Sequence, residues 1–159
     1  MGNNTELYAQ DFYVWCLTTA ALIREGKWYD IDPEALAEEI ESVGHQDKRE
    51  LESRLGSLLV HLLTWWACPE KRCGQWKSTI RQERREVALL LRDSPSLQTA
   101  LPAILSEEYP LARAKALAET RLSRLPIRCP FTPQEVVAET FWPEDMMLAP
   151  QDAPRESSA

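Results

Sequence analysis

The sequence predicts an all-α fold, an up-and-down helical bundle with additional short helices. Three observations support this prediction. Apolar side chains recur every three or four residues along most of the 159-residue chain, as they do on amphipathic helices. Proline and glycine separate these periodic segments, and no alternation of apolar and polar residues is long enough for a strand. The composition, 44% hydrophobic and 27% charged, is that of an ordinary globular protein.

The first predicted helix spans residues 8–23, whose aromatic and aliphatic side chains fall on one broad face. Thr5 is expected to cap its start, because a hydroxyl oxygen can accept a hydrogen bond from a free backbone N–H group. Gly26 is expected to end it, because glycine readily adopts the left-handed conformation found after helices.

A second helix is expected to begin at Asp32 and Pro33, an N-cap followed by a first-turn proline. The same helical spacing of apolar residues resumes over residues 51–66. Gly44 leaves open whether one kinked helix or two helices cover this region. Three apolar side chains are expected to line the inner side of the first part: Leu36, Ile40 and Val43.

The second half of the chain predicts further helical segments. An amphipathic helix is expected over residues 76–92. Ser94 and Pro95 then begin a short helix. The longer helix that follows is expected to be kinked or broken near Tyr109, because Pro110 lacks a backbone N–H. A capping box opens the last short helix and is formed by Thr132, Pro133 and Glu135.

The length is most simply that of one domain. We expect a single helical domain over residues 1–145 and a flexible C-terminal tail over 146–159, where Pro, Asp and Ser are frequent. The N-terminus lacks a basic start followed by an apolar run, and no apolar segment approaches the ~18 residues of a membrane span. The sequence therefore predicts a cytoplasmic protein with reduced cysteines and no membrane partner.

Charge is unevenly distributed along the chain, whose net charge is −7. Residues 71–85 contain six cations and one anion, and Trp76, Arg81 and Arg84 in this stretch are candidate residues for binding nucleic acid. Residues 30–52 contain nine acidic and two basic side chains. We expect the two segments to pack against each other and neutralise each other's charge. Nucleic-acid binding is therefore disfavoured, although it remains an alternative.

Three candidate metal ligands, His61, Cys68 and Cys73, lie close together in the sequence. A structural zinc site takes four Cys or His ligands, usually as two close pairs. The second pair is missing here, and helical geometry places His61 beside the apolar stripe of its helix, away from the turn that carries the cysteines. We therefore expect no metal and no cofactor.

The acidic run at residues 38–41 supplies the candidate catalytic residues. Glu38 and Glu41 are three positions apart, so they share one face of a helix. With His61 from a neighbouring helix, they would suit metal-assisted or acid–base hydrolysis. A solvated acidic face is the simpler interpretation, so no catalytic residue is assigned and enzyme activity is not the leading hypothesis.

Four segments resemble the bacterial family catalogued as domain of unknown function twenty-nine: LYAQDFYVW, LAEEIESVG, ESRLGSLLVHLLTWW and WKSTIRQERREVALLLRDSPSL. The resemblance covers about residues 6–145. It implies a small helical protein of the bacterial cytoplasm, with no established activity. The family pattern includes the acidic helix, the pair His61 and Trp65, and a series on the basic helix formed by Trp76, Ile80, Arg81 and Arg84.

The leading hypothesis is a non-enzymatic protein-interaction or regulatory module of an antitoxin-like kind, which binds another protein or another copy of itself. Trp28, Tyr29 and Trp142 are the expected contact region, because large aromatic side chains are enriched in interfaces. The first alternative is a hydrolase that uses Glu38, Glu41 and His61. The second is nucleic-acid binding through the basic stretch from Lys71 to Arg85.

Overall fold

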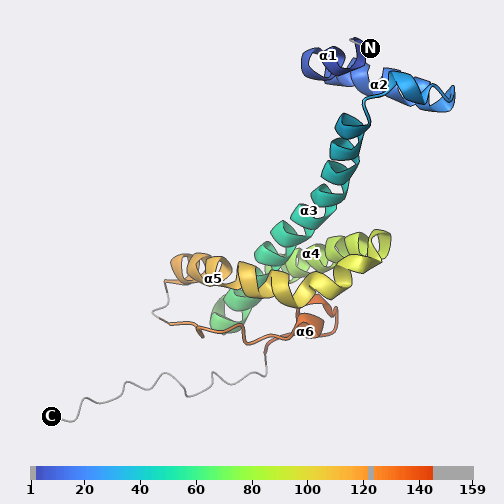
Figure 1. Cartoon of the computed structure of the whole chain (residues 1–159). Coiled ribbons are helices and arrows are strands. Elements are labelled where there is room, and N and C mark those ends of the chain that lie inside the picture. Colours follow the sequence, from blue (N-terminus) through green and yellow to red (C-terminus); the bar gives the residue numbers. More distant parts are fainter. Residues whose placement is uncertain (1–2, 122–123, 145–159) are drawn as a thin grey trace. The chain divides into compact units, whose positions relative to one another are not determined.

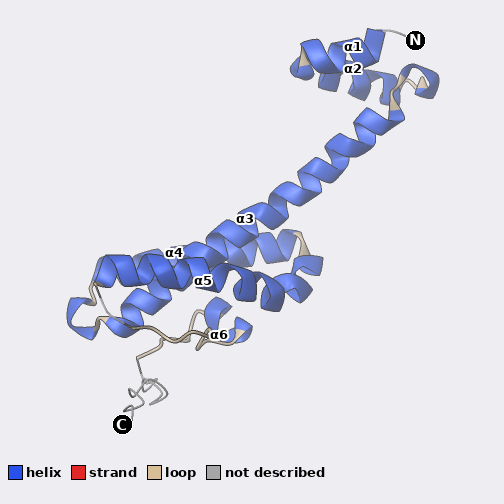
Figure 2. Ribbon diagram, turned by 60° about the vertical axis from the view of Figure 1, so that its left-hand side comes forward, coloured by secondary structure: helices blue, strands red, loops and turns tan. Residues whose placement is uncertain are grey.

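The computed structural model describes residues 3–121 and 124–144, so the predicted tail lies outside the described residues. Every regular element within these two ranges is a helix, which confirms the all-α prediction (Figures 1 and 2). The α-helices are α1 (Asn3–Gln10), α2 (Phe12–Arg24), α3 (Pro33–Ala67), α4 (Gly74–Asp93), α5 (Leu101–Thr120) and α6 (Pro133–Val137). Three short 3-10 helices join them: η1 (Trp28–Asp30), η2 (Pro69–Lys71) and η3 (Pro95–Ala100).

The chain divides into two compact units. The first unit spans residues 1–48 and contains α1, α2, η1 and the N-terminal part of α3. The second unit spans residues 49–159 and contains the rest of α3 together with α4, α5 and α6. The single helical domain expected over residues 1–145 stays a prediction.

The first predicted helix is in fact two helices, α1 and α2. The chain breaks at Asp11, whose side chain caps α2 by accepting a hydrogen bond of 3.0 Å from the Val14 N–H. Thr5 is not an N-cap, and its hydroxyl donates to the Asp32 carboxylate at 3.0 Å. The expected end at Gly26 is confirmed, since this residue has φ +71° directly after the C-cap residue of α2.

α3 begins at the predicted N-cap. Asp32 Oδ1 accepts hydrogen bonds from the N–H groups of Glu34 and Ala35, at 3.1 and 3.2 Å. These bonds stabilise the carboxylate and lower the pKa of Asp32. Gly44 lies inside this one helix, so it does not separate two helices.

The expected inner face of the N-terminal part of α3 is wrong at two positions. Ile40 and Val43 are 64% and 66% exposed. Among the described side chains of the first unit, the buried ones are instead Trp15 and Thr19 of α2 with Ala35 of α3. The unit is too small to cover both sides of α3, so this apolar pair remains on the surface.

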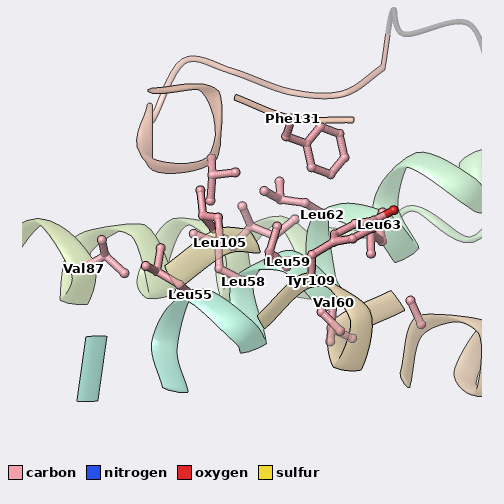
Figure 3. Close-up of a cluster of buried hydrophobic side chains, with 14 of the residues drawn as sticks. Leu55, Leu58, Leu59, Val60, Leu62, Leu63, Val87, Leu105, Tyr109 and Phe131 are labelled. Carbon is pink, nitrogen blue, oxygen red and sulfur yellow. The ribbon is translucent and has the colours of Figure 1, made fainter. Parts of the chain in front are cut away.

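The core of the second unit is built from the C-terminal part of α3, α4 and α5 (Figure 3). Leucines of α3 meet Leu105 and Tyr109 of α5, and Phe131 covers them from the segment before α6. α4 contributes Ile80 and Val87 to this core. The fully buried leucines of α3 recur at helical spacing, as the sequence predicted: Leu51, Leu55, Leu58, Leu59, Leu62 and Leu63.

The helix near Tyr109 was expected to be kinked or broken. α5 continues through Pro110, so the break is wrong and the kink stays a prediction. A proline removes one backbone hydrogen bond, and buried packing on either side can hold such a helix together. Tyr109 and Ala112 are both buried, and the Tyr109 hydroxyl donates to the Pro126 carbonyl at 2.7 Å. The short helix predicted before α5 is the 3-10 helix η3.

The last predicted helix, α6, is confirmed with its capping box. The Thr132 hydroxyl accepts from the Glu135 N–H at 3.2 Å, and Glu135 Oε2 accepts from the Thr132 N–H at 2.8 Å. Val136 on this helix is fully buried. α6 is thereby fixed against the second unit, where it receives the side chain of Arg84.

Candidate functional site

Cationic side chains surround Trp142 in the second unit. Lys77 Nζ lies 5.1 Å from the centroid of the Trp142 ring, and Arg81 Cζ lies 6.0 Å from it. Arg84 Cζ is 5.5 Å from the same centroid. These distances are typical of cation–π interactions. Three positively charged side chains therefore surround the aromatic ring of Trp142.

The neighbouring Trp65 extends this arrangement. Its ring centroid is 5.0 Å from that of Trp142, and Arg72 Cζ lies 5.4 Å from the Trp65 centroid. The Arg72 Nε–H also donates to the Trp65 carbonyl at 2.8 Å. We call the set Arg72, Lys77, Arg81, Trp65 and Trp142 the basic–aromatic patch.

Arg84 is not a surface residue, in contrast to its expected binding role, since its side chain is only 1% exposed. Its guanidinium donates three hydrogen bonds to backbone carbonyls, to Val136 at 2.9 Å, to Phe141 at 2.8 Å and to Glu135 at 3.2 Å. Burial lowers the pKa of Arg84 to about 10, which leaves the group charged at neutral pH. Its position defines it as a structural residue that holds α6.

Four cations of the basic stretch have no carboxylate partner among the described residues. Lys71, Lys77, Arg81 and Arg85 form no ion pair with any residue in the described ranges. The expected neutralisation of this stretch by the acidic segment is therefore not found at these four positions. Their charges remain available to an external anion.

Trp76, another predicted binding residue, is half-buried and packs against the core of the second unit. Trp65 is buried as well. Because the Trp142 ring already contacts three cations, the patch presents charge to the solvent and has little free aromatic surface.

A second candidate surface lies on the first unit, which exposes an unusual number of large apolar side chains. Trp28 is 62% exposed and Tyr29 is 97% exposed, so both are accessible as the predicted contact region requires. The third predicted contact residue, Trp142, is half-buried in the second unit. We call the following residues the apolar surface of the first unit: Phe12, Tyr13, Val14, Leu17, Trp28, Tyr29, Ile40 and Val43.

The first unit also carries the whole net charge of the chain. Residues 1–48 contain ten acidic and three basic side chains, whereas residues 49–159 contain fifteen of each. The local charge is therefore −7 on the first unit and zero on the second. Glu39 is engaged by the Tyr8 hydroxyl, which donates at 2.5 Å, and this bond contributes most to raising the pKa of Tyr8 to about 12.

Next to the apolar surface is an open cleft of about 370 Å³, lined by residues of α1, α2 and η1 with Asp32. Asn4 closes part of it by donating to the Asp30 carbonyl at 3.3 Å. Tyr29 lines the cleft as well. Most polar groups that line the cleft form hydrogen bonds within the unit. The cleft therefore offers a hollow beside Tyr29 with few free polar groups.

His61 lies in a groove of about 460 Å³ between α3 and α5 of the second unit. Glu108, Lys115 and Glu119 line the side of α5, and Ser57 lines the side of α3. The Ser57 hydroxyl donates to Glu83 Oε1 at 3.4 Å and not to His61. Ser57 is therefore not hydrogen-bonded to His61 as a serine activated by a histidine would be.

The predicted catalytic residues belong to different units. Glu38 and Glu41 are exposed on α3 in the first unit, whereas His61 belongs to the second. Their joint catalytic role stays a prediction. No group of three or more His, Cys, Asp or Glu residues in the described part of the chain is arranged to hold a metal ion.

All four cysteines are free thiols. Cys68 is buried, and burial is the main cause that raises the pKa of its thiol, whereas Cys73 is exposed. His61 lines the groove beside α5, and neither cysteine lines that groove.

The fold and these surfaces define an all-α protein with two compact units, an acidic apolar surface on one and a cationic patch on the other. The chain belongs to the DUF29 family, described as a domain of unknown function, whose profile matches residues 7–142. This confirms the resemblance seen in the sequence. The chain matches no curated protein and no solved structure. None of the described helices combines the length and apolar character needed to cross a membrane.

Sequence reasoning missed two features of these surfaces. The groove beside His61 is lined by Glu108, Lys115 and Glu119 on the side of α5. Their spacing of seven and four residues places them on one face of a helix. That spacing was available in the sequence. The exposure of Ile40 and Val43 carried no such signal, because their periodicity is the same as that of a buried face.

Proposed function

We propose that the protein is a non-enzymatic protein-interaction module of a regulatory kind, and that the apolar surface of the first unit binds a basic polypeptide. The observation that carries this proposal is the concentration of exposed apolar side chains on residues 12–43. In the described part of the second unit, which is larger, the exposed large apolar residues are Leu89, Leu111 and Ile127. Exposed apolar side chains mark protein-binding sites where they lie together, and we propose that those of the first unit do so.

The charge of the first unit selects the chemistry of the partner. A unit with a net charge of −7 repels a second acidic surface and attracts a basic one. Two first units are therefore poor partners for each other. A basic polypeptide with apolar side chains would cover the exposed aromatic and aliphatic residues and neutralise the acidic ones.

The contact region is expected to centre on Tyr29, which is almost fully exposed and lies beside the cleft. Aromatic side chains of this kind often supply a large share of binding free energy. Ile40 and Val43 extend the apolar area along α3. The hydrolase alternative is not carried forward, because its residues belong to different units, Glu38 and Glu41 to the first and His61 to the second.

Site-specific photo-crosslinking in the native host tests this proposal. A photoreactive aromatic residue replaces Tyr29 in the full chain, and a matched variant carries it at Gln98, an exposed position in the second unit. We expect a discrete adduct with a basic protein from the Tyr29 position only. The added substitution Val43→Asp is expected to reduce the adduct strongly without changing the helical circular dichroism.

Two results would contradict the proposal. One is the absence of any adduct at Tyr29 in a folded variant. The other is an adduct of equal yield at Tyr29 and Gln98, because this would indicate collision and not a specific surface.

A further inference from the structure

We propose that three cations of α4, Lys77 and Arg81 of the basic–aromatic patch and the neighbouring Arg85, bind the carboxylates of a second copy of this chain. The carboxylates belong to Glu34, Glu38 and Glu41 on α3, which we call the acidic stripe. This inference concerns a different surface from the proposed function and does not depend on it. It explains why Lys77, Arg81 and Arg85 of α4 form no ion pair with a described residue in a chain whose net charge is negative.

The cations of α4 form a regular row. Lys77, Arg81 and Arg85 are four residues apart, so they lie on one side of α4 at intervals of about 6 Å. Arg81 and Arg85 are exposed, and Lys77 is half-buried on the Trp142 ring. None of the three forms an ion pair with a described residue.

The acidic stripe has matching spacing. Glu34, Glu38 and Glu41 are four and three residues apart on α3, which places them on one side at intervals of about 5 to 6 Å. All three are exposed, and none forms an ion pair in the described ranges. Three carboxylates can therefore face three cations along two helices.

The acidic stripe and the apolar surface occupy different sides of α3. Glu38 and Ile40 are two residues apart, as are Glu41 and Val43, and side chains two apart on a helix point about 160° away from each other. Binding of the stripe to a second copy therefore leaves Ile40 and Val43 free for the basic partner proposed above.

The patch suits carboxylates better than nucleic acid. Proteins that bind single strands commonly stack bases on aromatic side chains. Here Trp65 is buried, Trp76 packs on the core, and the Trp142 ring is in contact with cations. A second copy offers carboxylates at the spacing of the cations and needs no stacking.

Each chain carries both surfaces, so each copy can supply carboxylates to one neighbour and cations to the same or another neighbour. Single exposed ion pairs contribute little, so association must depend on several pairs acting together. Screening by salt should therefore weaken it steeply. We expect self-association that increases with protein concentration and decreases with ionic strength.

A charge-swap experiment with the full-length protein tests this inference. One variant carries Lys77→Glu and Arg81→Glu, and a second carries Glu38→Lys and Glu41→Lys. The control carries Arg92→Glu and Arg128→Glu, which reverse two exposed cations outside the patch. Sedimentation velocity measures the association of each protein, and circular dichroism verifies its fold.

We expect the wild type and the control to self-associate at about 50 mM salt and to separate at about 500 mM, where the Debye length is short. Each charge-reversed variant alone should self-associate at least about tenfold more weakly, a difference of about 1.4 kcal/mol. An equimolar mixture of the two variants should associate again, because each supplies the surface that the other has reversed.

A wild type that stays monomeric at about 200 μM in low salt would overturn the inference, since any association would then be weaker than millimolar. A mixture that fails to associate would overturn it as well. A third contrary result is tight, salt-dependent binding of a fluorescent single-stranded RNA that the Lys77→Glu, Arg81→Glu variant loses while self-association is unchanged. That result would assign the patch to nucleic acid. Loss of crosslinking at Tyr29 would leave these outcomes unaffected.

Discussion

Replacement of Arg84 by methionine tests whether this buried cation holds the end of the second unit. Arg84→Met keeps much of the side-chain length and removes all three hydrogen bonds to the carbonyls of Glu135, Val136 and Phe141. The bond to Val136 is buried, so that carbonyl is left without a partner, whereas water can reach the other two. A buried acceptor without a partner costs about 1–3 kcal/mol, and bonds from a charged donor contribute about 1.5–3 kcal/mol each.

Removing the buried charge offsets part of this loss, because the protein no longer has to desolvate a guanidinium. We therefore expect the free energy of unfolding to fall by about 2–4 kcal/mol. For a chain of this size that corresponds to a Tm lower by roughly 10 °C. Arg84→Lys keeps the charge, but one ammonium group cannot reach three carbonyls. Its free energy of unfolding should therefore lie between those of the wild type and Arg84→Met.

Urea denaturation monitored by tryptophan fluorescence measures these differences, and Trp142 reports on the site because its ring centroid is 5.5 Å from the Arg84 guanidinium carbon. Arg85→Met is the matched control, since Arg85 is the exposed neighbour on the same helix. It should change the stability by no more than about 0.5 kcal/mol. Equal midpoints for Arg84→Met and Arg85→Met would refute the structural role of Arg84.

Three further variants or measurements test other parts of the fold. Gly44→Ala should raise the free energy of unfolding by about 0.5–1 kcal/mol in thermal or urea denaturation, because a Cβ there meets no atom within 4 Å and alanine favours helix. An unchanged or lower stability would contradict an uninterrupted α3. Burial raises the pKa of Tyr109 to about 12, so the folded state keeps its phenol proton more tightly than the unfolded chain. The stabilisation from this raised pKa is present below about pH 10 and is lost as the pH rises towards 12. Tyr109→Phe should lower the free energy of unfolding by about 1 kcal/mol at neutral pH. It should also reduce the decline of stability in alkaline urea titrations, and an equal decline in both proteins would contradict the burial of the Tyr109 phenol. A thiol reagent should modify exposed Cys73 rapidly and buried Cys68 only slowly, and equal rates in single-cysteine variants would contradict their different burial.

Local signals in the sequence predicted some of the helix ends. The capping box at Thr132 and the N-cap at Asp32 both form as expected, because each depends on hydrogen bonds to residues two or three positions away. Asp11 was missed although its bond to Val14 is equally local. The continuous apolar pattern around it concealed the break, and only the acidic residue itself indicated a new N-cap.

Which apolar side chains of α3 are buried depended on contacts with residues far away along the chain. Ile40 and Leu55 share the same helical periodicity on α3, yet one is 64% exposed and the other is fully buried. The difference is that α4 and α5 cover Leu55, whereas the first unit has no further helix to cover Ile40. Which apolar stripe receives a partner is decided by residues far away along the chain, and periodicity alone cannot indicate this.

The basic stretch shows why its residues must be tested separately. Ile80, Arg84 and Val87 lie three and four residues apart and all point into the core, whereas Arg81 and Arg85 lie on the exposed side of the same helix. A double reversal of Arg81 and Arg84 would abolish any binding signal, but it would do so by releasing α6 and damaging the fold. Reversal of Arg81 with Lys77 changes the surface charge and leaves the three carbonyl bonds of Arg84 in place. If the free energy of unfolding of the Lys77 and Arg81 variant is unchanged, a loss of binding can be attributed to the surface of α4.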